Sequence, residues 1–286
     1  MLEPIHIIGA SGRSGQALCR ALLARGTPYT PVIRDSQRWS TTNLPGKPII
    51  ADLTDHTLEA ALQTATTIVS CAHARHIPAV LRATASASHF VFLGSTRKFT
   101  RWPDAHGNGV LAGETALLAS GRPGILLHPT MIYGAEGEDN VRRLAALLRR
   151  LPIVPLPGGG KALVQPIHQS DVTACILAAL DHPAAKPETL VIAGPAPLSY
   201  ADFARAIARA AGLHPPRIVS VPPSLLHLAA PLARLAFLPR IGADEIRRLL
   251  EDKAFDIAPM EARLRVTPIT LAAGLALTFR TPPPCP

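Results

Sequence analysis

The chain has 286 residues, of which 48 % are hydrophobic and 17 % are charged, so it can bury a sizeable core and intrinsic disorder is excluded. The formal net charge is +9, but the basic residues are dispersed and no nucleic-acid-binding motif is present, so we expect no nucleic-acid partner. No segment has the length of a membrane span and the N-terminus lacks a signal-peptide pattern, which predicts a cytoplasmic protein without stable membrane insertion. None of the four cysteines belongs to a C-x-x-C pair, which favours free thiols over a metal site.

Short β-rich apolar runs alternate with helical patterns over the first two-thirds of the chain. The predicted strands are 5–8, 30–34, 48–52, 67–72, 90–95 and 124–134. The predicted helices are one from the first strand to about Arg25, then 58–65, 78–87 and 109–120. Strands that are apolar on both faces and separated by helices are typical of a parallel sheet covered on both sides. We therefore predict an α/β fold with a doubly wound parallel sheet.

After Gly134 the pattern changes. The predicted elements are an amphipathic helix at 140–151 with Asn140 as N-cap, helices at 171–180 and 199–212, and a strand at 190–194. A hairpin or a loop is expected for the Pro/Gly-rich stretch 152–168, which lacks the residues of a P-loop. The C-terminal part is predicted to be helical to about Phe255. Its apolar stretch 224–240 suits a core helix or, alternatively, a membrane-surface helix or a lipid-like substrate.

The sequence GASGRSG, residues 9–15, directly follows the first predicted strand and opens the first predicted helix. In this context Gly9 permits a tight turn, Gly12 lets the backbone approach a pyrophosphate, and Gly15 lets the helix pack on the strand. The N-terminus of the helix then offers free N–H groups to a phosphate. We predict a dinucleotide site whose first contacts are Gly9, Ser11, Gly12, Arg13, Ser14 and Gly15.

The end of the second predicted strand, VIRDSQR, bears on the choice of dinucleotide. An acidic residue there binds the adenosine ribose hydroxyls, whereas an arginine suits a 2′-phosphate. Arg34 holds this place, Arg38 follows one turn later, and Asp35 is one residue late for the ribose. With Arg13 in the glycine loop, this pattern predicts NADP(H), with NAD(H) still possible. The alternative is that these arginines are solvated surface residues.

Several motifs together resemble the atypical and extended short-chain dehydrogenases/reductases, which include the NAD(P)-dependent epimerase/dehydratase and NmrA-like proteins and the complex I accessory-subunit-like reductases. They are IHIIGASGRSG, VIRD, ADLTD, FVFLGST, LLHPTMIYG and PIHQSDV. The resemblance implies a Rossmann core at 1–134. Residues 135–286 would supply the remaining core elements and a small C-terminal substrate lobe, within a single structural unit. Further cofactor contacts are then expected at Asp52, Leu53, Cys71, Ala72, His73 and Pro129.

In active members of this superfamily a Ser or Thr follows the fifth strand, and a Tyr-x-x-x-Lys pair lies on the next helix. Ser95 and Thr96 match the first feature. Taking Glu114 as the acid that follows the lysine puts His106 at the place of the tyrosine and Val110 at that of the lysine. Because no tyrosine occurs between Tyr29 and Tyr133, the pair is absent rather than misplaced.

The catalytic candidates are therefore Ser95, Thr96 and Tyr133. Candidate substrate contacts are Lys98, Gln165 and His168, whereas His106 is expected in a Gly-rich surface loop. The helix at 109–120 is expected to bury five apolar residues against the sheet, with Ala112 and Gly113 allowing close approach. The five are Val110, Leu111, Ala112, Leu117 and Leu118.

Two functions fit this sequence. The first is an NADP(H)-dependent oxidoreductase or epimerase-like enzyme without the usual pair, acting on a small or lipid-like carbonyl or sugar substrate. The second is a non-catalytic NADP(H)-binding redox sensor or assembly factor of the NmrA-like kind. Either would be a monomer or a homodimer.

Overall fold

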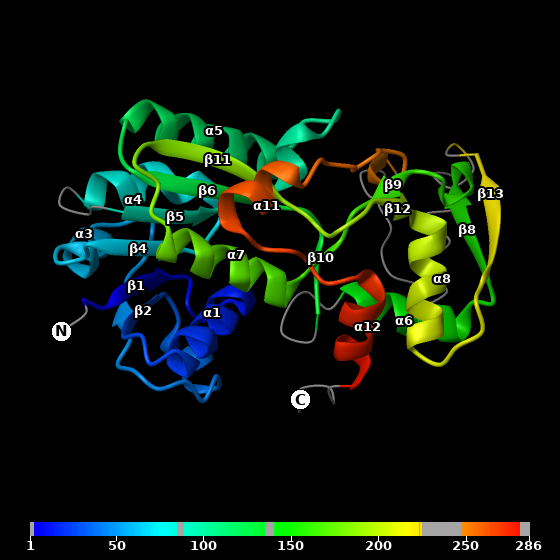
Figure 1. Ribbon diagram of the computed structural model, residues 1–286, viewed down its shortest axis with the longest axis horizontal. Helices are drawn as coiled ribbons and strands as arrows, with labels where there is room; N and C mark the ends of the chain where they lie inside the picture. The colour runs from blue at the N-terminus through cyan, green and yellow to red at the C-terminus, as the bar shows by residue number, and fades with distance from the viewer. Residues whose placement is uncertain (1–2, 85–88, 135–139, 223, 225–246, 281–286) are drawn as a thin grey trace. The chain divides into compact units, whose positions relative to one another are not determined.

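The computed structural model describes residues 3–84, 89–134, 140–222, 224 and 247–280 (Figure 1). The apolar stretch 224–240, apart from Ser224, and the tail 281–286 lie outside the described residues. The chain forms two compact units. The first consists of 1–130, 169–192 and 257–267, and the second of 131–168, 193–256 and 268–286.

The first unit contains a seven-stranded sheet in the order β11-β6-β5-β4-β1-β2-β3, and all of its neighbouring strands run parallel. This confirms the predicted parallel α/β sheet. The order reverses between β1 and β4, so the residues that follow these strands diverge and open a crevice. The strands are β1 (Ile5–Ile8), β2 (Tyr29–Ile33), β3 (Ile49–Ile50), β4 (Thr67–Ser70), β5 (His89–Leu93), β6 (Gly124–Pro129) and β11 (Pro187–Ile192).

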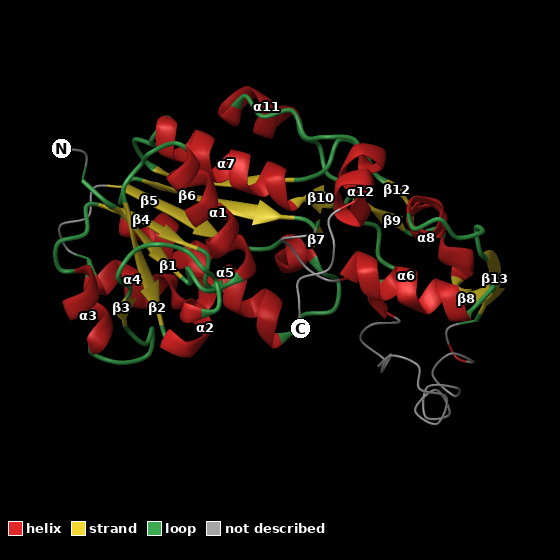
Figure 2. Ribbon diagram, turned by 90° about the horizontal axis from the view of Figure 1, so that it is seen from below, coloured by secondary structure: helices red, strands yellow, loops and turns green. Residues whose placement is uncertain are grey.

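Helices cover both faces of this sheet (Figures 1 and 2). On one face α1 (Arg13–Ala24) packs against α7 (Gln169–Asp181), and on the other α4 (Ile77–Ala83) packs against α3 (Thr57–Leu62) and α5 (Ala105–Ser120). The core under α3, α4 and α5 includes the fully buried Phe90, Leu62 and Leu117. The remaining elements are α2 (Ser36–Ser40), α11 (Ala258–Leu264) and the 3₁₀ turns η1 (Ala74–His76) and η2 (Thr96–Phe99).

Three predicted boundaries in this unit differ from the structure. The third strand is only Ile49–Ile50, at the edge of the sheet. The run 124–134 is interrupted after Pro129, and its last residues form a separate strand, β7 (Ile132–Tyr133). Helix α5 begins at Ala105 because the Asp104 side chain caps it, accepting a hydrogen bond from the Gly107 N–H at 2.8 Å. Residues 105–108 are therefore helical and do not form the expected loop.

The buried face of α5 differs in part from the expected one. Val110 and Leu117 are buried as predicted, but Ala112 is exposed and the side chains of Leu111 and Leu118 are 45 % and 46 % exposed. The buried face is completed instead by Gly107 and Gly113, which bring the helix onto the backbone of η2 and η1. A Cβ on Gly113 would clash with the carbonyl oxygen of Ala74, so this close approach requires glycine.

The second unit contains three two-stranded sheets, β10-β7, β12-β9 and β13-β8. Its helices are α6 (Asn140–Arg150), α8 (Tyr200–Ala210) and α12 (Leu271–Arg280). These helices pack around a common hydrophobic core that includes Tyr133, Phe203, Ile207 and Leu275. The strands not yet given are β8 (Ile153–Pro157), β9 (Leu163–Val164), β10 (Ile167–His168), β12 (Leu198–Ser199) and β13 (Arg217–Val221).

Two expectations for this part of the chain are wrong. The stretch 152–168 forms no hairpin, because β8, the 3₁₀ turn η3 (Gly158–Gly160), β9 and β10 follow one another and each strand pairs with a distant segment. Residues 252–257 are not helical, and helices resume at 258–264 and 271–280.

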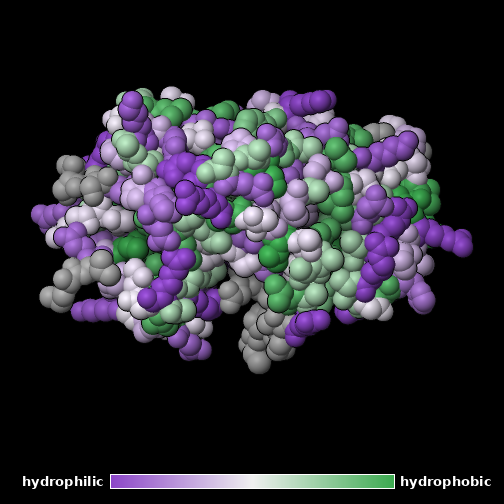
Figure 3. Space-filling model, in the orientation of Figure 1, coloured by the Kyte–Doolittle hydropathy of each residue, from purple (hydrophilic) through white to green (hydrophobic). Residues whose placement is uncertain are grey.

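No helix of the described segments combines the length and the apolar character needed to cross a bilayer. On the face that Figure 3 presents, hydrophobic residues are interspersed with hydrophilic ones. Isolated exposed apolar residues, such as Leu23 and Ile50, are normal on a protein surface.

We expect Gly113→Ala to destabilise the protein by about 1–3 kcal/mol, because the new methyl group must displace the backbone of η1. Ala112→Leu, which adds more atoms on the exposed face of the same helix, should change stability by about 0.5 kcal/mol or less. Urea unfolding of the two variants and the native chain measures both effects. Equal stability of Gly113→Ala and the native chain would contradict the close packing.

Candidate functional site

A groove of about 400 Å³ lies in the first unit, at the ends of β1, β2, β3 and β4. It brings together ten of the predicted cofactor contacts: Gly9, Ser11, Gly12, Arg34, Arg38, Asp52, Leu53, Cys71, Ala72 and His73. The sequence analysis did not single out Thr54 and His76, which also line it. Arg13, Ser14, Gly15 and Pro129 were predicted but do not line this groove.

The glycine loop has the geometry that a phosphate cradle needs. Gly9 has a φ of +75°, which side-chain-bearing residues rarely adopt, and its carbonyl accepts the Gly12 N–H at 2.9 Å. A Cβ on Gly15 would clash with the Gly9 carbonyl oxygen, so Gly15 has the packing role that was predicted for it. Because Gly12 lines the groove as the N-cap of α1, and the first turn of α1 has no acidic residue, the site fits an anion.

Ser14 has a structural contact instead of facing the groove. Its hydroxyl donates to Oε1 of Gln169 at 3.1 Å, which ties the first turn of α1 to α7. This contact holds the N-terminus of α1 in place beneath the glycine loop.

The end of β2 presents two arginines to the groove. Among the described residues, the guanidinium groups of Arg34 and Arg38 have neither a hydrogen bond nor an ion-pair partner, and both residues are exposed. Asp35 caps α2, its Oδ1 accepting the Arg38 N–H at 3.1 Å. One oxygen of the only acid at this strand end is therefore already engaged, whereas both cations are available to an anion.

Asp52 follows β3 and turns toward its own loop. Its Oδ1 accepts the N–H and the hydroxyl of Thr54, at 2.9 and 2.7 Å. The hydrogen bonds from Thr54 are the main reason that the pKa of Asp52 is lowered, and Arg34 adds to the effect. Asp52 is therefore an ionised acceptor in the same groove as the arginines that follow β2.

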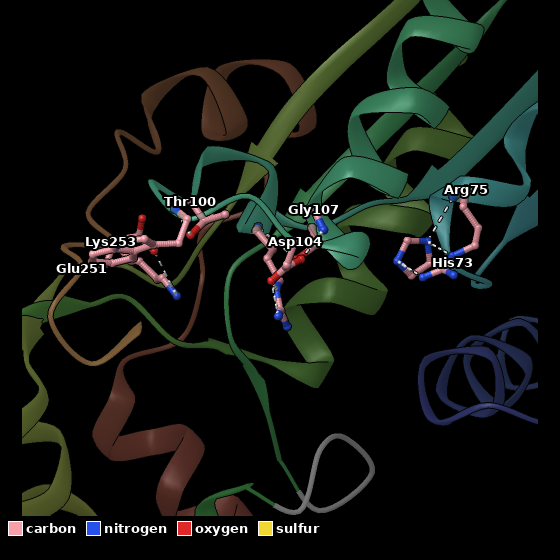
Figure 4. Close-up of polar contacts among 10 residues, drawn as sticks. His73, Arg75, Thr100, Asp104, Gly107, Glu251 and Lys253 are labelled. Carbon is pink, nitrogen blue, oxygen red and sulfur yellow. Dashed lines mark hydrogen bonds and ion pairs between the residues drawn. The ribbon is translucent and has the colours of Figure 1, made fainter. Parts of the chain in front are cut away.

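The residues after β4 form another part of the wall. Burial raises the pKa of the Cys71 thiol to about 12, so it carries no thiolate at neutral pH. Burial, with the positive charges of His106, Arg75 and His76, lowers the pKa of His73 to about 4. Nδ1 of His73 accepts the backbone N–H of Arg75 at 3.1 Å and its Nε–H at 3.2 Å, and Figure 4 shows the guanidinium of Arg75 beside the ring. His73 is therefore a neutral imidazole held in one orientation.

His106 lies beside this imidazole. It belongs to the first turn of α5, where the helix replaces the expected loop, and Figure 4 shows the Asp104–Gly107 contact that starts the helix. The rings of His106 and His73 meet edge to face, with centroids 4.3 Å apart. The expected loop is therefore wrong at this position, because His106 is helical and half-buried, with a groove residue packed on its ring.

A second polar cluster involves Glu114 of α5. Glu114 forms an ion pair with Nζ of Lys98, and its Oε2 is 3.1 Å from Nε2 of His128. The side chains of Lys98, Glu114 and His128 are only 8 %, 18 % and 1 % exposed. Burial is the main reason that the pKa of His128 falls to about 4, and Lys98 contributes. The predicted substrate contact Lys98 is thus paired inside the protein, and the Val110 side chain is buried.

Ser95 and Thr96 lie where β5 turns into η2. The Ser95 hydroxyl oxygen accepts the Arg97 N–H at 3.2 Å, and its own proton is available to another acceptor. Thr96 is buried, and its hydroxyl donates to the carbonyl oxygen of Pro129 at 3.3 Å. Thr96 therefore fastens the turn, and Ser95 is the better placed of the two to donate to a ligand.

The remaining candidates belong to the second unit. Tyr133 is 1 % exposed, and its ring meets that of His168 edge to face with centroids 5.2 Å apart. A Cβ on Gly274 would clash with the Tyr133 hydroxyl oxygen, so α12 packs closely on it. Gln165 donates to the Gly194 carbonyl at 2.8 Å and accepts the Phe255 N–H at 2.7 Å. All three are held in the interior of this unit, and their roles at a substrate remain predictions.

The described residues contain no group of side chains suited to a metal ion. Cys19, Cys71 and Cys175 are free thiols, as predicted, and Cys285 lies outside the described residues.

We expect the buried His128 to make stability depend on pH. Its pKa is about 4 in the folded chain against 6.5 for an ordinary histidine, so the unfolded chain binds more protons between these values. The resulting loss of stability is on the order of 2 kcal/mol between about pH 7 and pH 5. Unfolding of His128→Phe by urea at both pH values should show a smaller loss. The exposed His182→Phe should behave like the native chain, and an identical loss in all three proteins would contradict the assignment.

Comparisons with known proteins find structural relatives only. No family model and no curated protein sequence matches the chain. A structure of MoeE5 with UDP-glucose and NAD is 19 % identical, with a TM-score of 0.73 over 97 % of this chain and 98 % of that one. A UDP-glucuronic acid 4-epimerase from Bacillus cereus, in complex with UDP-glucuronic acid and NAD, is 16 % identical, with a TM-score of 0.74 over 97 % and 98 %.

An NADPH-dependent quinone oxidoreductase from Escherichia coli is 16 % identical, with a TM-score of 0.73 over 95 % of this chain and 98 % of that one. Likeness over nearly the whole length at such low identity shows a common fold, and substrate and reaction do not follow from it. The chain therefore has a Rossmann-type α/β fold.

Proposed function

We propose that this protein is an NADP(H)-dependent oxidoreductase or epimerase-like enzyme of the short-chain dehydrogenase/reductase kind. The observation that carries the proposal is the groove at the reversal of the sheet, in which a glycine cradle and the unpaired Arg34 and Arg38 line one cavity. The likeness to solved structures described as NAD complexes and as an NADPH-dependent enzyme supports a nicotinamide dinucleotide.

The preference for the 2′-phosphate is argued from the β2 end of the groove. A phosphate monoester carries nearly two negative charges and suits the planar donors of arginine. Arg34 and Arg38 line the groove without a hydrogen-bond or ion-pair partner for their guanidinium groups among the described residues. One carboxylate oxygen of Asp35 already accepts the hydrogen bond that caps α2. An adenosine ribose without the phosphate would leave both guanidinium groups without an ion-pair partner among the described residues.

In the proposed reaction a nicotinamide held by the groove would supply the hydride chemistry, and the residues of this chain bind and orient the substrate. The Ser95 hydroxyl donates to a carbonyl oxygen of the substrate, while Thr96 and the Lys98–Glu114–His128 cluster hold the β5 turn that carries Ser95. Because the described part of α5 carries neither tyrosine nor lysine, the proton comes from this turn or from water that it orders. A small carbonyl or sugar compound, or a lipid-like carbonyl compound, is the proposed substrate class.

A second candidate function is a non-catalytic NADP(H)-binding sensor or assembly factor. It is favoured by the state of three side chains that were expected near a reacting substrate. Val110, at the place of the lysine, is apolar and buried, Lys98 is paired with Glu114, and Tyr133 is buried. Both functions require the same dinucleotide groove. They differ in whether a substrate is turned over.

We expect NADPH to bind more tightly than NADH, and Arg34→Ala to weaken NADPH by about 1.5–3 kcal/mol with little effect on NADH. The reason is that only NADPH presents a phosphate to the arginine. Isothermal calorimetry with both dinucleotides measures the effect. Arg25→Ala is the matched control, because Arg25 pairs with Asp181 away from the groove. Equal affinities of NADPH and NADH for the native protein would refute the preference.

Ser95→Ala should lower turnover by about tenfold or more while NADPH affinity stays within a factor of two, because the hydroxyl acts on the substrate and not on the dinucleotide. The assay is oxidation of NADPH with a panel of carbonyl, quinone and enoyl compounds. Arg101→Ala, at an exposed residue shortly after the same turn, serves as the control. If NADPH binds but no compound of the panel is reduced, the sensor function is favoured.

A further inference from the structure

His76 lines the same groove as Arg34 and Arg38, and no sequence motif pointed to it. It is the last residue of η1, the turn that follows β4, and its N–H donates to the His73 carbonyl at 3.0 Å. This turn is fixed from the other side by the close approach of Gly113 to Ala74. The His76 backbone is therefore held rigidly at the wall of the groove.

Charged groups from several segments act on the His76 ring. Arg34 after β2 and Arg75 from its own turn oppose its protonation, Asp52 from the β3 loop favours it, and His73 lies three residues earlier and also lines the groove. Within the described part of the chain the imidazole has no hydrogen-bond partner. A half-buried ring without a partner, in the same groove as two unpaired arginines, has its nitrogen atoms available to a ligand there.

We infer that His76 is the third member of the 2′-phosphate site, and that it takes up a proton when the phosphate binds. The inference rests on the proposed preference for NADP(H). Two arginines, which stay charged, would give a preference that does not change with pH. A histidine gains or loses its charge near neutrality, so with His76 in the site the preference for NADP(H) depends on pH.

The sign of the dependence follows from the local charges. In the free protein burial lowers the pKa of His76 below its usual 6.5, with Arg75 and Arg34 adding to the effect and Asp52 opposing it. The attraction of a phosphate dianion bound among Arg34, Arg38 and His76 outweighs the repulsion from the arginines. The pKa of His76 is then higher in the complex than in the free protein. NADPH affinity must then rise as pH falls through the interval between the two pKa values. NADH, which lacks the phosphate, should show no such rise.

The test is the affinity of the protein for NADPH and for NADH between pH 6.5 and pH 8.5, a range in which the free phosphate is mostly a dianion. We expect the NADPH/NADH affinity ratio of the native protein to fall by about three- to tenfold from the lower to the upper end. Calorimetry in buffers of different ionisation enthalpy measures the protons taken up directly. We expect about 0.2–0.8 proton per NADPH near neutral pH and close to none per NADH.

Two variants isolate His76. His76→Asn, which keeps a polar side chain but cannot titrate, should lose both the pH slope of the ratio and the proton uptake, and it should bind NADH as the native protein does. His56→Asn is the matched control. His56 is an exposed histidine of the same unit and does not line the groove, so both signals should persist.

The outcomes separate this inference from the function on which it rests. If the native protein prefers NADPH through Arg34 but takes up no proton, or if His76→Asn keeps the slope and the uptake, the role of His76 is refuted and the preference for NADP(H) stands. If the native protein shows no preference for NADPH at any pH, the proposed cofactor itself is refuted. The native measurement alone decides whether protons are taken up, even if a variant fails to fold.

Discussion

The close contact between Gly15 and the carbonyl oxygen of Gly9 is the constraint on which the rest of the candidate site depends. No side chain fits between the two backbones, so α1 begins directly behind the end of β1 and its N-cap, Gly12, lines the groove. Ser14, bonded to Gln169 of α7, fixes the same turn from the side. The glycine cradle is thus held by backbone packing and by the Gly12–Gly9 hydrogen bond within it.

Glycine has a second structural role on the opposite face of the sheet. Gly113 lets α5 approach the backbone of η1. The N-cap of η1 is His73 and its last residue is His76, and both line the groove. Helix α5 therefore positions the wall of the groove although Val110 stands where its lysine was expected. The lysine that this region does contain is Lys98 of η2, and it forms an ion pair with Glu114 of α5. In this protein α5 packs against η1 and η2, and its His106 ring packs against His73 of the groove.

Much of the first unit could be predicted from the sequence, because its strands and glycine loop are signalled by local patterns. The alternation of apolar runs and helices predicted the parallel sheet, and G-x-x-G-x-x-G at a strand–helix junction predicted the cradle. Helix boundaries were harder, since the cap at Asp104 begins α5 four residues before the apolar pattern does. In the second unit, β8, β9 and β10 each pair with distant segments, and short strands of this kind have no local signal for their partners.

The sequence by itself determined the fold class and the residues that follow β1 to β4, because periodicity and glycine spacing are properties of neighbouring residues. Only the tertiary structure decided which of these side chains meet. It paired Lys98 with Glu114, it buried Tyr133, and it placed His76 in the groove of Arg34. None of these follows from spacing along the chain, because each depends on the contact of elements that are distant in sequence. Charge, burial and access to a ligand are properties of that packing, and the chemistry of the site follows from them.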